Sequence, residues 1–595
     1  MGRYHESMGK QSGAVHVVRV RKSHVDKGGV RRDYQSAYLR RTFREGGKVR
    51  NETVANLSAL PAHLVDWVEA GLKGKSLVPA DQAATITASV PHGHVAAVSA
   101  QANTLGLPAL LGPAGRVRDL ALALIISRVI RPASKLATAS WWDDTTLGVD
   151  LEVAGASTDE VYACMDWLLD HQDAIEAKLA QRHLAGPANP SRMALFDLSS
   201  SWMEGSHCPL AKRGYSRDGK KGSLQIEYGL LTDPAGRPVA IKVFEGNTAD
   251  PTAFTHAVQT VRDTFKLTQL VMVGDRGMIT NARISAVRAD PDSELGWLTA
   301  LRAPAIKALA AAGGPLQPTL FDQHNLAEIS HPDYPGERLI ACRNPFLAED
   351  RARKRNELLT ATEQLLAPIT AAVNQGRLVG AERIGLRVGK IINKYKMAKH
   401  LQVTITDTTL HITRNTSQIH TEAALDGIYV LRTTVPAEQL DAAGVVTAYK
   451  NLAKVERDFR SLKVDDLDLR PIFHRLEDRV RAHVFIVMLA GYLTWHLRKT
   501  LAPLTFTDQQ PPTPTDPIAP ATRSAAAARK ASTRTAEDSQ PVRSFRGLLD
   551  HLATLTRNDI QYGPEGPIVP TLAVPTTTQR RVFELLHSTI PLNLK

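Results

Sequence analysis

The sequence predicts an α/β fold: a mixed five-stranded sheet with helices, interrupted by an insertion domain and preceded by β-rich and helical domains. Three observations favour it. The chain has 595 residues, more than one hydrophobic core usually serves. Its composition, 43% hydrophobic and 22% charged, is that of a globular protein. Short apolar runs between residues 193 and 302 are spaced first as strands alone and then as alternating strands and helices.

The first part of the chain favours strands and then helices. Residues 15–57 alternate apolar and polar positions, and Gly28-Gly29 and Gly46-Gly47 mark expected hairpin turns. This stretch is rich in Arg and Lys, which favours a DNA-contacting face and a merely solvated face about equally. Helical patterns follow over 62–72 and 116–185.

The core strands are expected as three consecutive runs followed by alternation with helices. This is the strand order of an RNase H-like fold. The expected strands are MALFDLSS (193–200), LQIEYGLLTD (224–233), PVAIKVFEG (238–246), QLVMVGD (269–275) and WLTALR (297–302), with helices over 252–266 and 281–288.

The rest of the chain completes a seven-part division. Residues 501–541 are rich in Pro, Thr, Ala and Ser, which predicts a disordered linker. The expected parts are 1–115 (β-rich and helical, a DNA-binding candidate), 116–190 (helical), 191–302 (first part of the catalytic core), 303–435 (insertion domain with strands), 436–500 (second part of the core), 501–541 (linker) and 542–595 (C-terminal tail).

Charge and cysteine usage point to a basic protein of a reducing compartment. The 73 Lys and Arg against 60 Asp and Glu give a net charge of +13, which favours a polyanionic partner such as nucleic acid, although a basic surface without a partner is an alternative. The three cysteines are too scattered for a disulfide framework. The N-terminus lacks the apolar stretch of a signal peptide, and the longest apolar runs, 119–130 and 484–493, are too short to span a membrane. A cytoplasmic protein is therefore expected.

Two aspartates in apolar strands are the first candidates for chemistry. Asp197 lies within LFDLSS and Asp275 ends VMVGD. A buried charge without a partner is costly, and if these strands form a parallel pair, a divalent cation could neutralise both carboxylates. Alternatively, Asp197 caps a turn with Ser199 and Ser200, and Asp275 begins an ordinary turn at the strand end. The occurrence of both in this order favours a metal site.

A third carboxylate is expected on a helix over 448–463. Leu452, Val455, Phe459 and Leu462 form its apolar stripe, with Glu456 at the edge. Tyr449, Glu456 and Lys463 recur every seven residues, which predicts that they align along one side of the helix. A charged helix rim is the alternative.

This segment resembles the signature of bacterial insertion-sequence DDE transposases of the insertion-sequence-four superfamily. The family pattern is Tyr, two residues, Arg, three residues, Glu, six residues, Lys, and here Tyr449, Leu452, Glu456 and Lys463 occupy these positions. Leu452 stands where the family has Arg. The segments GYSRDGKKGSLQIEYGLLTDPAGRPVAIKVFEGNTAD, RPASKLATASWW and HRLEDRVRAHVFIVMLAGYL are similar to family segments as well. The resemblance spans roughly residues 120–500, with the insertion-sequence-1634 subgroup as the nearest suggestion.

The resemblance implies a transposase that cleaves element ends and joins them to target DNA. Asp197, Asp275 and Glu456 would be catalytic and would hold two Mg²⁺ (or Mn²⁺) ions. The expected partners are the terminal inverted repeats and target duplex DNA, bound by a homodimer at the bacterial nucleoid, without a membrane. The residues expected to contact DNA are Tyr449, Lys463, Arg460 (Arg457 is an alternative substitute for the missing Arg), Arg276 and the basic loop of Lys212, Arg213, Arg217, Lys220 and Lys221, for which an exposed solvated turn is the alternative.

Two rival functions share these residues. One is an RNase H-like nuclease or resolvase that cuts DNA without joining it, and the other is a non-catalytic DNA-binding derivative of a transposase. The presence of all three carboxylates argues against the second rival. Some relatives stack a Trp of the insertion domain on a flipped base, and residues 303–426 contain no Trp, so the use of a DNA hairpin stays open.

Overall fold

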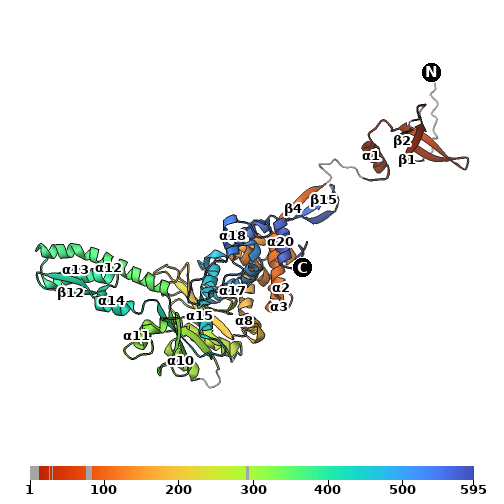
Figure 1. Cartoon of the computed structure of the whole chain (residues 1–595). Helices are drawn as coiled ribbons and strands as arrows, with labels where there is room; N and C mark the ends of the chain where they lie inside the picture. Colours follow the sequence, from red (N-terminus) through yellow and green to blue (C-terminus); the bar gives the residue numbers. More distant parts are fainter. Residues whose placement is uncertain are drawn as a thin grey trace. The chain divides into compact units, whose positions relative to one another are not determined.

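The computed structural model describes residues 13–25, 27–29, 31–75, 84–267, 269–289, 294–563 and 565–594. The chain divides into two compact units. One consists of Met1–Ser89 with Asn558–Thr571, and the other of Val90–Arg557 with Leu572–Lys595. The elements of each unit can be followed by label and colour in Figure 1.

The first unit contains an antiparallel sheet of β1 (Ala14–Val25), β2 (Arg31–Glu45) and β3 (Lys48–Asn56). Gly46 and Gly47 join β2 to β3 at φ values of 56° and 78°, a conformation that glycine adopts without strain. This confirms the hairpin predicted there. Helix α1 (Ala62–Leu72) packs on β1, where the Arg19 guanidinium contacts the Asp66 carboxylate.

A second three-stranded sheet joins sequence-distant parts of the chain. Its order is β16-β15-β4, with β4 at Thr85–Pro91, β15 at Thr556–Gln561 and β16 at Ile568–Leu572. The C-terminal segment therefore pairs with a strand from near the N-terminus. Next to this sheet, the backbone N–H groups of His92 and Gly93 both donate to the Leu555 carbonyl at 2.9 Å.

Helices of the second unit build most of its hydrophobic core. Helix α4, which contains the first apolar run expected from the sequence, is buried along nearly its whole length. The helices that precede the main sheet are α2 (Gly93–Thr104), α3 (Leu107–Leu111), α4 (Arg116–Ile130), α5 (Lys135–Trp142), α6 (Thr146–Asp150), α7 (Thr158–Asp170), α8 (Gln172–His183) and the short η1 (Gly186–Ala188). Ser157 caps α7 in a capping box with Glu160, which explains the start of that helix.

The main sheet is mixed and has eight strands in the order β10-β11-β14-β9-β8-β5-β6-β7. β5, β8 and β9 are parallel, whereas β5, β6 and β7 form an antiparallel meander. The bounds are β5 Met193–Trp202, β6 Gln225–Thr232, β7 Pro238–Glu245, β8 Val271–Val273, β9 Gly296–Ala300, β10 Leu326–Ile329, β11 Arg338–Arg343 and β14 Ile428–Thr433. The connecting elements are α9 (Asp250–Gln259), the π-helical η2 (Thr260–Thr264), α10 (Asn281–Arg288), α11 (Ala303–Leu309) and η3 (Pro318–Phe321).

The expectation of a five-stranded sheet is therefore wrong in its strand count. The five expected strands are present and adjacent, but β14, β11 and β10, from the segment expected to be an insertion, extend the sheet beyond β9. β14 pairs with β9 at Leu431 and Ala300, and β11 pairs with β14. The buried apolar faces of β11 and β14 pack with α11 and η3 in a second core cluster. Burial of this apolar surface stabilises the three additional strands.

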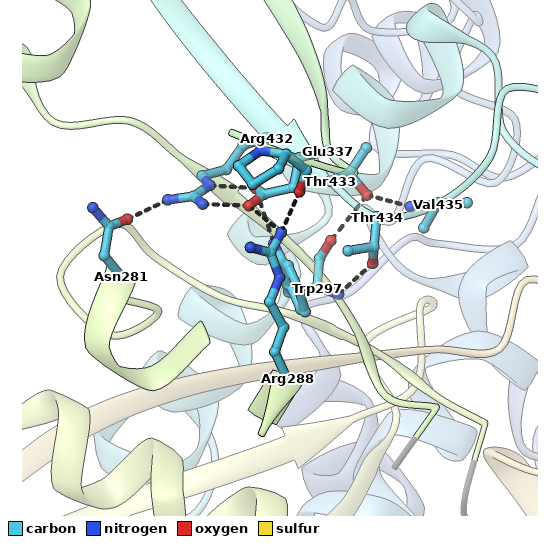
Figure 2. Close-up of polar contacts among 9 residues, drawn as sticks. Asn281, Arg288, Trp297, Glu337, Arg432, Thr433, Thr434 and Val435 are labelled. Carbon is cyan, nitrogen blue, oxygen red and sulfur yellow. Dashed lines mark hydrogen bonds and ion pairs between the residues drawn. The ribbon is translucent and has the colours of Figure 1, made fainter. Parts of the chain in front are cut away.

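A buried polar network fixes the junction between β9 and β14 (Figure 2). The fully buried Glu337 carboxylate accepts hydrogen bonds from Arg432 at 2.5 Å, Arg288 at 2.8 Å and the Trp297 indole at 3.2 Å. Arg432 also donates to Asn281 at the start of α10. Because β9 is the neighbour of β8, this network anchors the part of the sheet beside Asp275.

The true interruption of the sheet is the segment between β11 and β14, here called the insertion module (residues 345–426). It consists of α12 (Pro345–Asn374), α13 (Ala381–Lys394), η4 (Ala398–His400), the hairpin of β12 (Leu401–Ile405) and β13 (Leu410–Arg414), and α14 (Thr416–Ala423). In Figure 1, α12 and α13 lie side by side, and the two helices and the hairpin share a third core cluster.

After the sheet, helices return. The elements are α15 (Ala442–Lys450), α16 (Leu452–Arg460), the π-helical η5 (Ser461–Asp465) and α17 (Glu477–Thr500). Helix α17 contains the apolar run 484–493, and by length and composition alone this 24-residue helix could cross a membrane. However, 83% of its apolar window is buried inside the protein, as in a core helix.

The segment 501–541, expected to be a disordered linker, differs from that expectation. It contains η6 (Ala502–Leu504) and α18 (Ala525–Thr533). The Lys530 ammonium donates to the carbonyls of Ala502, Thr505 and Thr507 at 3.0–3.2 Å, and Ile518 is buried in the main core. The amino-acid composition of the segment, from which disorder was predicted, does not reveal these contacts. The tail, with α19 (Phe545–Ala553) and α20 (Thr577–Leu585), also packs into that core.

Candidate active site

The strands that lead to Asp197 and Asp275 are parallel neighbours in the sheet. Leu195 of β5 lies opposite Val273 of β8, and Asp197 and Asp275 each follow this pair by two residues. Asp197 lies within β5, whereas Asp275 follows β8 in a turn closed by hydrogen bonds from the amides of Met278 and Ile279 to the Asp275 carbonyl. The predicted parallel pairing of these two strands is confirmed.

Alternation along β5 places Asp197 on the face of the sheet that α16 covers. Asp197 and Ser201 share this face, because side chains two or four residues apart point the same way. The Ser201 hydroxyl lies 2.9 Å from that of Tyr228, whose ring packs against Phe459 of α16 with centroids 5.7 Å apart. Glu456 lies one turn before Phe459 on the same side of α16. The sheet and the helix thus bring Glu456 toward Asp197.

The ionisation of Asp197 reflects this neighbourhood. Burial raises its pKa to about 7, and the negative charges of Glu456 and Asp275 act in the same direction. The amide of Leu198, which donates to Oδ1 at 2.8 Å, and the charge of Arg217 oppose the shift. Glu456 and Asp275 therefore each lie close enough to Asp197 to act on it electrostatically.

Tyr449 borders the same group. Burial raises the pKa of its phenol, and the charges of Asp275, Asp197 and Glu456 add to the effect, while Arg276 opposes it. The Tyr449 phenol therefore lies within electrostatic reach of all three carboxylates.

The carboxylates do not converge as a finished metal site. Within the part of the chain that the structure describes, no three His, Cys, Asp or Glu side chains have an arrangement that could hold a metal ion. The donor set nevertheless suits a hard divalent cation, because it consists of carboxylate oxygens. Glu456 is exposed and forms no ion pair with any described residue. The Asp275 carboxylate accepts a hydrogen bond from the amide of Arg276 at 2.6 Å.

The single regular helix expected over 448–463 is not found: it is interrupted at Asn451 and widens to a π-helix over Ser461–Asp465. Tyr449 lies on α15, Glu456 on α16 and Lys463 in the π-helical η5. The helical pattern tightens at Asn451 and widens in η5, where the Asp466 amide bonds to the Ser461 carbonyl. As a result, Glu456 is exposed, whereas Lys463 is buried.

The basic loop after β5 divides into exposed and internally paired residues. Arg213 and Lys221 are exposed without an ion pair to any described residue, and Lys220 lies over the Trp202 ring at 5.0 Å. Lys212 lies 4.0 Å from Glu245. Arg217, in contrast, contacts Asp250 at 2.6 Å and Glu227 at 3.1 Å, and its amide donates to the Ser200 hydroxyl. The Arg217 guanidinium is therefore paired with acidic side chains of the protein itself.

The remaining candidates for DNA contact also divide into exposed residues and a residue that is paired inside the protein. Arg276 and Arg460 are exposed, and their side chains form no ion pair with a described residue. Lys463 donates to the buried Asp218 at 2.9 Å. Five of the candidates, Arg213, Lys220, Lys221, Arg276 and Arg460, are therefore exposed.

Sequence reasoning missed the acidic partners of the basic loop. Glu227 lies in a fully buried strand, where burial raises its pKa to about 7, and Asp250 is the first residue of α9. A Cβ atom on Gly277 would lie 3.6 Å from Oδ2 of Asp250 and 3.9 Å from Oδ2 of Asp275, so these two carboxylates share one neighbourhood. The available signal was a Glu inside an apolar strand, the same signal that marked Asp197.

Comparison with known proteins identifies the domain around these residues. Residues 197–493 match the family model of the transposase DDE domain, and the match begins at Asp197 and includes Asp275 and Glu456. The chain contains a transposase DDE domain. Its mixed α/β architecture with a large mixed sheet is consistent with a transposase nuclease fold.

Similarity beyond this domain is slight. No curated protein matches the chain significantly. Among solved structures, a piggyBac transposase in a synaptic complex with hairpin DNA is similar at 8% identity and a TM-score of 0.30, over 64% of this chain. The alignment covers 66% of that transposase, slightly less than two thirds of its length.

Proposed function

We propose that this chain is a DNA transposase that cleaves the ends of an insertion sequence and joins them to target DNA. The observation that carries the proposal is that the helix of Glu456 packs on the strand of Asp197, whose parallel neighbour leads to Asp275, within residues that match the transposase DDE domain. The strand order β7-β6-β5-β8-β9, with the meander antiparallel and β5, β8 and β9 parallel, supports an RNase H-like core.

The three carboxylates would hold two Mg²⁺ or Mn²⁺ ions. Such ions, when bound, activate water and stabilise the leaving oxyanion of a phosphodiester. The protein's part is to supply rigid oxygen ligands: Asp197 from the middle of β5, Asp275 from a turn closed by its own carbonyl, and Glu456 from α16. A cation would also offset the repulsion that helps to raise the pKa of Asp197.

The exposed basic residues near the carboxylates would position DNA. Arg276 adjoins Asp275, and Arg460 lies one turn after Glu456 on α16. Arg213, Lys220 and Lys221 belong to the loop that leaves the strand of Asp197. Cations next to a metal-binding cluster provide contacts to the phosphates that flank the cleaved bond. We also propose a homodimer on DNA, membership of the insertion-sequence-four superfamily, and a bacterial cytoplasmic location, all from the sequence resemblance.

The proposal is tested with the full chain, Mn²⁺ and a DNA substrate that carries the inverted repeats flanking the gene. Asp197→Asn, Asp275→Asn and Glu456→Gln should each abolish metal-dependent cleavage and joining while duplex binding is retained. Glu349→Gln, an exposed carboxylate on α12, is the matched control and should remain active. Cleavage without joining by the unmodified chain would favour a nuclease, and full activity of all three variants would refute the assignment.

A further inference from the structure

Helix α13 of the insertion module has an apolar face and a basic face. Ile384 and Val388 are buried in the third core cluster, and Ile391 and Ile392 pack against it. This side holds α13 against α12 and β12. The polar side of α13 therefore faces away from the module's own core.

Four exposed cations form a stripe on the polar side. Arg383, Arg387, Lys390 and Lys394 follow one another at steps of four, three and four residues, and all are exposed. At 3.6 residues per turn these positions fall within an arc of about 60° and extend over about 16 Å of helix. These four residues are called the α13 stripe below.

The α13 stripe has no acidic partner among the residues that the structure describes. Among the described residues, the one polar or ring contact of its side chains is that of Lys394 over the Tyr395 ring, at 5.3 Å. Four other basic residues of the module are paired: Arg353 with Asp350 and Glu357, Lys399 with Glu422, Arg414 with Glu363 and Arg355 with Asp426. The α13 stripe, in contrast, presents four cations in a row without an acidic partner among the described residues.

The module is held firmly enough to present this stripe. Its chain ends meet where the Asn344 amide donates to the Gly427 carbonyl at 2.9 Å. Nearby, the buried Arg355 contacts Asp426 at 2.5 Å, tying α12 to the segment that returns to β14.

We propose that the α13 stripe is a docking surface for the sugar–phosphate backbone of duplex DNA, separate from the carboxylate site. The four cations extend over about 16 Å, and a DNA strand carries one phosphate per 3.4 Å of rise. The stripe therefore offers roughly one cation for every one or two phosphates of a strand. Phosphate contacts fix the position of a duplex without reading its sequence. The choice of DNA among polyanions rests on the proposed function, because the stripe lies within residues 197–493, which match the transposase DDE domain.

The stripe has a specific consequence for salt dependence. Each phosphate contact contributes about 0.9 to the slope of log affinity against log salt concentration. Arg387→Ala, Lys390→Ala and Lys394→Ala combined should therefore lower the slope by about 2 to 3 and weaken binding at least about tenfold near 0.15 M salt.

The test uses fluorescence anisotropy with the full chain, a labelled 30-base-pair duplex of arbitrary sequence, and EDTA to prevent cleavage. The matched control combines Arg353→Ala, Lys399→Ala and Arg414→Ala, which removes the same charge from the same module at exposed, already paired positions. The control should bind within about threefold of the unmodified chain, since exposed ion pairs contribute little to folding. Arg387→Lys, Lys390→Arg and Lys394→Arg combined should restore both slope and affinity. Circular dichroism confirms folding of every variant.

The outcomes separate this inference from the proposed function. Equal losses in the stripe and control variants, or no loss in either, would overturn the inference while DNA binding by the unmodified chain stands. Absence of duplex binding by the unmodified chain would overturn both. Loss of binding to phosphatidylserine vesicles by the stripe variant, with duplex binding unchanged, would show that the stripe serves a membrane and would also overturn the inference.

Discussion

The ammonium of Lys463 donates a 2.9 Å hydrogen bond to Oδ1 of Asp218, linking the segment after Glu456 to the loop after Asp197. Arg470 lies 2.5 Å from the same oxygen, and the Asp218 side chain is only 1% exposed. Burial lowers the pKa of Lys463, and its bond to Asp218 opposes that shift. One carboxylate thus holds two cations and fastens together the two parts of the chain that supply Asp197 and Glu456.

Asp218→Asn should therefore destabilise the protein. The substitution leaves Lys463 and Arg470 without their anionic partner, and breaking a buried pair in this way costs about 3–5 kcal/mol. Chemical denaturation followed by circular dichroism measures the change in the free energy of unfolding. Asp465→Asn, an exposed position in the same π-helical segment, is the control and should change it by less than about 0.5 kcal/mol. Equal stability of both variants would mean that the pair does not support the fold.

Asp197→Asn should stabilise the metal-free protein in a pH-dependent way. The folded pKa is about 7, above the ordinary value of 3.8, so the penalty for ionising Asp197 is absent below about pH 4 and complete above pH 7. Relative to the unmodified chain, the gain in unfolding free energy should grow across this window to the order of 4 kcal/mol. Thermal or urea unfolding in EDTA at several pH values measures it. A difference that stays constant with pH would contradict the shifted ionisation.

Arg217→Ala should cost stability rather than only DNA affinity. It removes the guanidinium between Asp250 and Glu227, whose side chain is 3% exposed, and leaves two neighbouring carboxylates without it. A loss of about 2–3 kcal/mol is expected, with partial recovery in Arg217→Lys, because one ammonium is a poorer bridge than a planar fork. Urea unfolding is the measurement, with the exposed Arg213→Ala as control. Unchanged stability in Arg217→Ala would instead leave Arg217 as a DNA contact.

Glu337→Gln should weaken the junction of β9 and β14 shown in Figure 2. The fully buried carboxylate accepts from both Arg432 and Arg288, and its neutralisation leaves those guanidinium groups uncompensated. A loss of about 3 kcal/mol or more is expected. Differential scanning calorimetry against Glu349→Gln, an exposed carboxylate, measures it. Matching melting temperatures would show that the network adds nothing to stability.

The sequence was sufficient to predict the features that follow local patterns. The five core strands, the parallel pairing of the strands that carry Asp197 and Asp275, and helix α10 were expected, because apolar runs bounded by turn residues mark them. The extension of the sheet by β10, β11 and β14 was not, since pairing between strands far apart in the chain leaves no local pattern. The folded structure of residues 501–541 depends on the contacts of Lys530 and Ile518, and amino-acid composition does not reveal such contacts.

The candidate site was predictable to the same extent. Carboxylates in apolar strands drew attention to Asp197 and Asp275, but the break between α15 and α16 and the π-helical turn before Lys463 depend on packing rather than periodicity. The internal roles of Arg217 and Lys463 depend on Asp250 and Asp218, which lie 33 and 245 residues away from them in sequence.

The most direct measurement is the anomalous scattering of Mn²⁺ in crystals of the full chain. We expect anomalous density between the carboxylates of Asp197, Asp275 and Glu456, and its loss in crystals of Asp197→Asn. Mn²⁺ bound only elsewhere, or a Glu456 carboxylate that points away from ions held by the two aspartates, would contradict a shared metal site on this face of the sheet.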